Sequence, residues 1–268
     1  MRILGQSDSE YSADLTASRQ QSGRRVRALG YSILEGPNGV DGNAVHSKDA
    51  DAGATRIAGR PLRVGWVTDA VFGPVDPEIT VVVVSAVGRL ADLGHEVEQV
   101  ELPFLDNPIG ALMTLVYGEI VPSIKALAAG REEQLHAIGA GIVGVPDPPF
   151  ADYLAAEAQG EERRYAISGF FERCDVLLTP ANPMTATPRS VQDLVVNGQP
   201  VAWMHVMAAT SPFNLAGLPL LSVPYALSSE QLPIGIQLLG KWLDEATLLR
   251  LGSMLERRGG LGDRRPNL

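Results

Sequence analysis

The chain has 268 residues, of which 45% are hydrophobic and 20% charged, and its 22 basic and 31 acidic side chains leave a formal net charge of −9. This composition is typical of a soluble globular protein. The acidic balance, without a cluster of Lys and Arg, argues against a nucleic-acid partner because phosphate binding depends on such clusters. The single cysteine, Cys174, cannot form an internal disulfide, so the sequence predicts a reducing, cytoplasmic environment.

Neither secretion nor a membrane partner is expected. The best apolar runs, 79–87 and 137–145, are shorter than the roughly 18 residues that a membrane span needs. The first residues include Asp8, Glu10 and Asp14, where a signal peptide would have a basic start and then an apolar stretch.

Residues 1–60 are expected to form an irregular N-terminal arm and linker. They are rich in Ser, Gly, Asp, Arg and Ala, and a segment with so few bulky apolar side chains buries too little surface to offset the entropy of ordering. One short helix is expected near 24–34. The pattern changes at Pro61.

The next segment predicts a strand, a helix and a second strand. Residues 62–67 are nearly continuously apolar, which is typical of a strand buried on both faces. Asp76 caps the following helix and Gly94 ends it, and the stretch 95–102 forms the second strand. This order predicts a parallel βαβ unit.

The rest of the chain continues the α/β pattern. Residues 108–172 are mainly helical, with interruptions at Pro122, at Gly130 and in a loop over 139–149. Short strands are expected at 175–179, 220–224 and 234–239, an extended proline-rich loop at 180–188, and a last helix capped by Asp244 with Leu248, Leu251 and Leu255 on one face. Residues 259–268 are expected to form a flexible tail.

Three glycines, Gly139, Gly141 and Gly144, have the spacing of a dinucleotide-binding fingerprint. Such a site requires a strand before the glycines and a helix after them, because the helix N-terminus receives the pyrophosphate. Here a helix over 131–138 is expected before them and prolines follow. The sequence therefore predicts a connecting loop rather than a nucleotide site.

No metal site or complete nucleophile motif is evident. The histidines show none of the spacings that zinc sites favour, and they lie at His46, His95, His136 and His205. Cys174 precedes a strand, where a lone cysteine is usually a small buried hydrophobe. No serine lies in a Gly-x-Ser-x-Gly elbow. We expect neither a metal ion nor an organic cofactor.

Three stretches in the second half of the chain read together as a specific pattern. They are Arg173 to Pro183 (RCDVLLTPANP), Ser211 to Pro224 (SPFNLAGLPLLSVP) and Leu232 to Leu249 (LPIGIQLLGKWLDEATLL). From their residues alone, these stretches would be strands and loops. In this order and spacing they resemble the C-terminal part of the amidase signature family, and the resemblance covers residues 35–258.

The resemblance implies a fold and a chemistry. It implies an α/β/α domain with a mixed β-sheet, of which residues 61–258 are the C-terminal part. Family members hydrolyse amide C–N bonds with a serine nucleophile, a second serine in a cis peptide and a lysine, without a cofactor. Those groups lie in an upstream Gly/Ser-rich signature that residues 1–60 do not contain, and the only lysines are Lys48, Lys125 and Lys241. No catalytic residue can therefore be assigned.

What remains by resemblance is part of the wall of a pocket for a small amide substrate. The residues expected to contact that substrate are Thr179, Asn182, Met184 and Asn214. The alternative for each is a structural role, since small polar loop residues often bond to the local backbone and Asn214 could cap a helix.

Two functions therefore compete. The first is an amidase-family hydrolase present as its C-terminal half and inactive alone, whether as a truncated gene product, a split subunit or a degenerate paralogue. The second is a noncatalytic binding or interaction protein. In both, sheet surface left uncovered favours a partner chain or self-association. A hydrolase that uses Cys174 or Ser222 with a histidine ranks last.

Overall fold

The computed structural model describes residues 60–69, 73–102, 108–188 and 193–259, together with positions 30–31, 33–34, 36–37 and 39–40. Helical geometry at positions 30, 31, 33 and 34 falls at the end of the short helix expected near 24–34. The rest of that helix, most of the expected arm and the tail after 259 lie outside the described residues.

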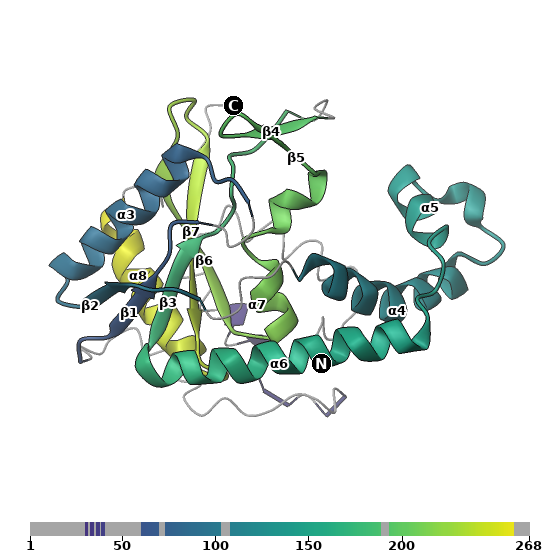
Figure 1. The fold of residues 1–268 in the computed structure, drawn as a ribbon, viewed down its shortest axis with the longest axis horizontal. Coiled ribbons are helices and arrows are strands. Elements are labelled where there is room, and N and C mark those ends of the chain that lie inside the picture. Colours follow the sequence, from purple (N-terminus) through teal and green to yellow (C-terminus); the bar gives the residue numbers. More distant parts are fainter. Residues whose placement is uncertain are drawn as a thin grey trace.

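A five-stranded mixed sheet forms the centre of the described structure (Figure 1). Its strands, in spatial order, are β2 (Glu96–Gln99), β1 (Arg63–Trp66), β3 (Val176–Pro180), β7 (Pro233–Gly240) and β6 (Leu220–Leu227). The β1 strand pairs in parallel with β2 and β3, whereas β7 is antiparallel to both β3 and β6. The expected parallel βαβ unit and the expected mixed sheet are both confirmed.

Helices cover both faces of this sheet, which gives the expected α/β/α layers. On one face, α3 (Pro77–Asp92) and α8 (Glu245–Gly259) share an apolar core with Leu178, Ile236 and other inward side chains. On the other face, α6 (Phe150–Arg173) and α7 (Ser211–Ala216) pack on Leu177, Leu239 and their neighbours. Successive side chains of β3 thus enter opposite cores, as the period of a strand requires.

The best-predicted helix is α3. Its first turn is capped by Asp76, whose Oδ1 accepts a hydrogen bond from the backbone N of Glu78 at 2.9 Å. Its buried stripe includes Ile79, Val83 and Leu90. Gly94 follows with φ of +85°, a backbone conformation that glycine adopts without steric cost.

The last helix also agrees with the sequence. Leu248, Leu251 and Leu255 of α8 are 2%, 0% and 0% exposed, and all three belong to the core shared with α3. They recur at helical spacing, so one stripe of α8 faces the sheet.

The region 108–149 differs from the expectation in two places. The long helix α4 (Ile109–Ala128) runs through Pro122, because its packing on α6 and α7 outweighs the one hydrogen bond that proline cannot donate. The order expected around the glycines is also wrong. A 3-10 turn, η2 (Glu132–Gln134), comes first, and the helix α5 (Ala137–Val143) then contains Gly139 and Gly141.

The α5 helix forms despite its glycines. The bonds from Ala140 N to His136 O (2.9 Å) and from Gly144 N to Ala140 O (3.0 Å) have helical spacing. Each glycine in a helix costs only about 1 kcal/mol relative to alanine, which does not forbid a short helix. The element ends before Pro146, as the restriction on residues preceding proline favours.

Two further elements were not predicted from the sequence. The stretch 211–219, interpreted as strand and loop, contains the helix α7. A small hairpin joins β4 (Leu194–Val196) to β5 (Gln199–Val201) through Asn197 and Gly198, which have φ of 49° and 73°. An Asn-Gly pair between two short apolar runs is a strong hairpin signal, so this element was predictable.

Among the described residues, one helix is long and apolar enough to cross a membrane by length and composition alone. This helix is α4, with a mean hydropathy of 1.3 over an 18-residue window of which 28% is buried. It contains no long uninterrupted apolar run, because Glu119 and Lys125 lie within it. Core helices of globular domains can have the same composition, and α4 packs against α6 and α7.

Candidate functional site

The candidate site lies beside the C-terminal ends of the parallel strands β1 and β3. In open α/β sheets the loops that follow such strands commonly surround a ligand. Here the loop after β3 is joined to the start of α3 by a hydrogen bond from Asp76 N to Pro183 O, at 2.9 Å. His205 joins the same region through a 2.8 Å contact between its Nε2 and Pro74 O.

A buried polar network centred on Gln237 lies at the end of β3, beside these loops. Gln237 on β7 is 0% exposed and lies opposite Thr179 on β3, which is 2% exposed. Its Nε2 donates to Thr179 Oγ1 at 2.7 Å and to Ala209 O at 2.6 Å. Thr179 in turn donates from Oγ1 to Pro180 O at 3.0 Å.

The orientation of the Gln237 amide follows from its partners. A backbone carbonyl can only accept, so the Ala209 oxygen requires the NH₂ end of Gln237. The opposite end, Oε1, is buried and receives no hydrogen bond from any described residue.

The short segment before α7 lies over this network and is itself tied down. It contains the 3-10 helix η3 (Trp203–Met207), and Ser211 Oγ donates to Met207 O at 2.7 Å. Asn182 Nδ2 donates to Val206 O at 3.3 Å, which links the loop after β3 to η3. The loops that follow β1 and β3 thus meet the segment that leads into α7.

The four residues expected to contact substrate lie in two places. Thr179, Asn182 and Met184 lie together at the end of β3, where Asn182 Oδ1 accepts from Met184 N at 3.3 Å. Asn214 is an exposed residue inside α7, which begins at Ser211, so the alternative that it caps a helix is wrong. Within the described ranges, no side-chain hydrogen bond joins it to the other three. Direct substrate contact remains a prediction for all four.

Gln237 was not predicted, although the sequence contains a signal. It is the one polar side chain within the apolar run 234–239. A buried polar group in such a strand requires hydrogen-bond partners and is therefore a candidate for a structural or functional network.

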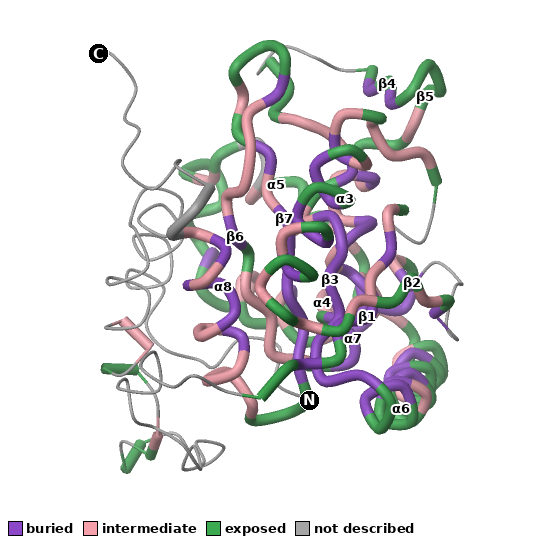
Figure 2. Tube along the Cα trace, turned by 90° about the vertical axis from the view of Figure 1, so that its left-hand side faces the viewer, coloured by how far each residue is buried: buried purple, intermediate pink, exposed green. Residues whose placement is uncertain are grey.

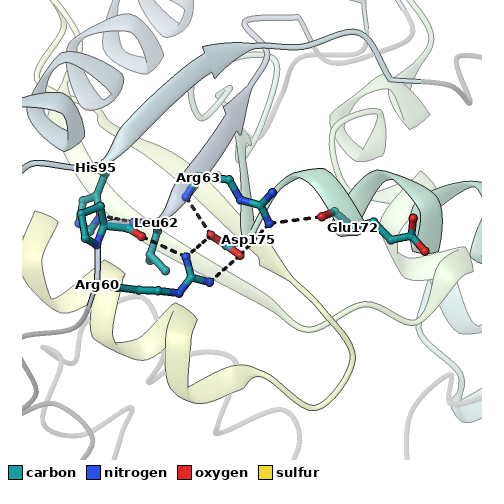
Figure 3. A network of polar contacts seen from close by, with 7 residues as sticks. Arg60, Leu62, Arg63, His95, Glu172 and Asp175 are labelled. Carbon is teal, nitrogen blue, oxygen red and sulfur yellow. Dashed lines mark hydrogen bonds and ion pairs between the residues drawn. The ribbon is translucent and has the colours of Figure 1, made fainter.

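A second polar cluster, centred on Asp175, lies at the other end of these strands, beside the N-terminal ends of β1 and β3 (Figure 3). Asp175 is 5% exposed and accepts from Arg60 Nη2 at 2.9 Å and from the backbone N of Arg63 at 2.9 Å. Burial alone would raise the pKa of this carboxyl, but the hydrogen bonds from Arg60 and Arg63 outweigh it and hold the pKa well below its usual range. The cluster joins two neighbouring strands and is structural.

His95 lies at the same edge in a related role. Its Nδ1 accepts a hydrogen bond from the backbone N of Leu62 at 3.1 Å, so this nitrogen is unprotonated (Figure 3). Burial, with a smaller contribution from the charge of Arg250, lowers the pKa of the imidazole. Its ring therefore acts as an acceptor that fixes the entry into β1.

The other nucleophile candidates gain no support. Burial raises the pKa of the Cys174 thiol, which disfavours the reactive thiolate. No hydrogen bond joins Cys174 or Ser222 to a histidine within the described ranges. In the same part of the chain, no group of His, Cys, Asp and Glu side chains is arranged to hold a metal ion.

The comparisons with known proteins identify the class. The fold is that of the amidase signature enzymes, and the family model for Amidase matches residues 28–249. This chain belongs to the amidase family.

Two curated relatives show how far the likeness extends. The A subunit of glutamyl-tRNA(Gln) amidotransferase from Rhodospirillum rubrum is 32% identical over 230 residues, which cover 74% of this chain and 44% of that protein. The Synechococcus sp. protein of the same name is 27% identical over 268 residues, covering 87% of this chain and 52% of that protein. The chain therefore spans about half the length of these relatives.

A solved structure shows the same fold. The 6-aminohexanoate cyclic dimer hydrolase complexed with its substrate superposes with a TM-score of 0.79 at 22% sequence identity. The likeness covers 91% of this chain and 55% of that one. The mixed sheet and the helical layers are thus shared with a protein whose chain continues beyond the matched part.

Proposed function

We propose that this chain forms the substrate-pocket half of an amidase-family enzyme that hydrolyses amide C–N bonds, and that it is inactive alone. The observation that carries the proposal is the buried Thr179–Gln237–Ala209 network at the end of β3. It fixes the backbone around a candidate pocket without presenting an activated nucleophile. Family membership supports the reaction class.

The chemistry that is absent explains the expected inactivity. Amide hydrolysis needs a nucleophile, a group that moves its proton and donors for the oxyanion, and these supply most transition-state stabilisation. This sequence contains no Gly/Ser-rich signature. Among its lysines, Lys125 forms an exposed ion pair with Asp147 at 2.8 Å. We propose that a polypeptide segment outside these 268 residues supplies the reacting groups.

The pocket residues would then set substrate binding rather than chemistry. Thr179, Asn182, Met184 and Asn214 are proposed to contact the acyl or amine part of a small amide. The polar loop after β3 offers donors and acceptors, and Met184 offers an adaptable apolar surface. The free, buried state of Cys174 supports a cytoplasmic location.

The first test uses the chain alone. The purified protein is exposed to a fluorophosphonate probe and its intact mass is measured, while hydrolysis of a chromogenic anilide is followed in parallel. We expect no adduct and no hydrolysis. A stoichiometric adduct on one serine of the folded chain would contradict the proposed inactivity.

The second test adds the missing half. The first half of the Rhodospirillum rubrum amidotransferase chain is co-expressed with this chain, and anilide hydrolysis by the assembly is measured. We expect activity in the assembly and a rise of about tenfold in KM for Asn182→Ala, with Ser168→Ala on the exposed side of α6 as the matched control. An assembly that binds the anilide without hydrolysing it would instead support the noncatalytic binding protein.

A further inference from the structure

His205 is a buried polar side chain in a segment that is otherwise exposed or half-buried. Among residues 197–207, all of which the structure describes, it alone is buried, with 8% of its surface exposed. It lies in η3, where its backbone N donates to Ala202 O at 2.9 Å. A polar side chain is buried at such a position when a hydrogen-bond partner offsets its loss of hydration.

The partner of His205 is the segment 73–76, which precedes α3. Its Nε2 lies 2.8 Å from Pro74 O, although the two residues are 131 positions apart in the chain. A carbonyl oxygen can only accept, so Nε2 carries the hydrogen and donates it. Gly73 lies against the ring, because a Cβ at this position would be 3.1 Å from Cε1 of His205. The segment therefore fits the imidazole by close contact as well as by a hydrogen bond.

The residues that follow His205 lead directly into the Gln237 network. Ala208 N donates to His205 O at 2.9 Å. Ala208 and Ala209 form a small buried cluster on which Val75 packs. Ala209 O then accepts from Nε2 of Gln237 at 2.6 Å, and Gln237 lies on β7, which Figure 2 shows as buried over most of its length. One short segment thus contacts the residues before α3 on one side and the sheet on the other.

Two further hydrogen bonds connect the loop after β3 to the same residues. Asp76 N donates to Pro183 O at 2.9 Å, and Asn182 Nδ2 donates to Val206 O at 3.3 Å. With the His205 bond, these contacts close a ring between the segment 73–76, the loop after β3 and η3. Among the described residues, the His205 bond is the one hydrogen bond that joins 73–76 directly to η3.

From this arrangement we propose that His205 is a positioning residue for the candidate pocket. Its imidazole holds the segment 73–76 against η3, and the same segment keeps Ala209 O in place for Gln237. Loss of the bond opens the ring of contacts and loosens the loop after β3, which carries Asn182. His205 acts through these groups rather than on reacting atoms, so it affects substrate binding more than the chemical step. The inference rests on the proposed function, because it assigns a role in that pocket.

Nuclear magnetic resonance of the unmodified 268-residue chain tests the hydrogen bond without any substitution. The Nε2–H proton of His205 should be detected and should exchange slowly with water, because it is buried and donates to Pro74 O. His136 is exposed immediately before α5, and its ring N–H should exchange too fast to be detected. Fast exchange of the Nε2–H proton of His205 would overturn the proposal.

Two substitutions separate the hydrogen bond from the volume of the ring. His205→Phe keeps a planar ring without a donor, and His205→Gln keeps a donor. In His205→Phe, amide exchange at Asp76, which bonds to Pro183 O, should quicken by about tenfold. His205→Gln should restore most of the protection, and the matched control His136→Phe should leave it unchanged. Circular dichroism establishes that the variants are folded, and the measurement on the unmodified chain does not depend on them.

The kinetic readout uses the assembly of this chain with the first half of the Rhodospirillum rubrum amidotransferase chain. We expect His205→Phe to raise KM for the anilide by about tenfold and to change kcat by less than about twofold, because a loosened pocket wall weakens ground-state and transition-state binding alike. His205→Gln should return KM close to that of the unmodified assembly. A purely structural role would instead lower the amount of active protein, and with it kcat, at unchanged KM.

The outcomes separate this inference from the proposed function. Unchanged exchange at Asp76 in His205→Phe would overturn the positioning role whether or not the assembly is active. Unchanged KM in an active His205→Phe assembly would overturn it as well. Faster exchange at Asp76 together with an assembly that hydrolyses nothing would support the role of His205 in holding the loop and would contradict the proposed function.

Discussion

Replacing Asp175 with asparagine tests whether the carboxylate cluster holds β1 and β3 together. The carboxylate accepts from two Arg60 nitrogens at 3.0 and 2.9 Å, from Arg63 N at 2.9 Å and from Arg63 Nη2 at 3.3 Å. Asparagine retains one acceptor and loses the charge. A hydrogen bond to a charged group contributes about 1.5–3 kcal/mol, and both guanidinium groups are partly hydrated, so we expect a loss of about 2 kcal/mol at neutral pH.

The same cluster predicts a pH dependence. The pKa of Asp175 is lowered in the folded protein from an ordinary value of 3.8, so the folded carboxylate stays charged where the unfolded one takes up a proton. Its contribution is complete above the unfolded pKa and is lost as the pH falls toward the folded pKa. At about pH 3 this protonation lowers the free energy of the unfolded state by RT ln(1 + 10^0.8), or about 1 kcal/mol, and the free energy of unfolding falls by the same amount.

The assay is urea unfolding of both proteins, followed by circular dichroism at neutral pH and at about pH 3. The difference in free energy of unfolding between wild type and Asp175→Asn should shrink from about 2 to about 1 kcal/mol. Asp92→Asn is the control, because the Asp92–Arg89 pair is 3.6 Å long and its carboxylate is 72% exposed. Equal stability of wild type and Asp175→Asn at neutral pH, or a difference independent of pH, would refute the reasoning.

Three further predictions concern packing and titration. A Cβ at Gly118 would lie 2.7 Å from the Tyr153 ring, so Gly118→Ala should lower the free energy of unfolding by about 1–2 kcal/mol. Gly88 has open space around it, so Gly88→Ala should raise the free energy of unfolding by up to about 1 kcal/mol. Equal shifts of the two variants in thermal melts would contradict this prediction. The raised pKa of Cys174 predicts slow reaction with a disulfide reagent at neutral pH in the folded chain and fast reaction in urea, and equal rates would oppose it. The lowered pKa of His95 means that the folded state favours the neutral imidazole. The contribution of His95 to the free energy of unfolding should therefore be fully present above about pH 6.5 and decline below it. His95→Gln should reduce that decline when the free energy of unfolding is measured by urea titration at several pH values.

Local sequence signals were sufficient to predict the elements whose start and stop residues lie beside them. In α3, the capping Asp76, the apolar period and Gly94 all lie within or beside the element, so the sequence alone predicted its start, buried face and end. The α5 helix lacks such signals, because two of its seven residues are glycines and the contacts that favour it come from elsewhere in the fold. Its position could not be read from periodicity.

Strand order required information that no short window contains. Nothing in the local pattern of 234–239 indicates that β7 lies between β3 and β6 and runs antiparallel to both. The mixed sheet was expected only through the resemblance to a family. The hairpin at Asn197 and Gly198, by contrast, has a turn signal that is readable in the sequence.

The candidate site was predicted in the same uneven way. Thr179 was named from the resemblance, but its partner Gln237 is 58 residues away in the chain. Asp175 and Arg60 are separated by 115 residues, so their ion pair depends on the pairing of β1 with β3. Such contacts depend on the tertiary structure, so the roles of these residues become clear only once the fold is known.

The pairing of β1 with β3 also has a consequence for folding. In the β1–α3–β2 unit, Arg63 pairs with Glu96, which is only 33 residues later in the chain. Val64 of β1 pairs with Val176 of β3, which is synthesised 112 residues later. At about 5–20 residues per second, a ribosome takes roughly 6–20 s to synthesise that interval. During this time the inner side of β1 has no neighbour, so the nascent chain exposes a strand edge on which chaperones could act.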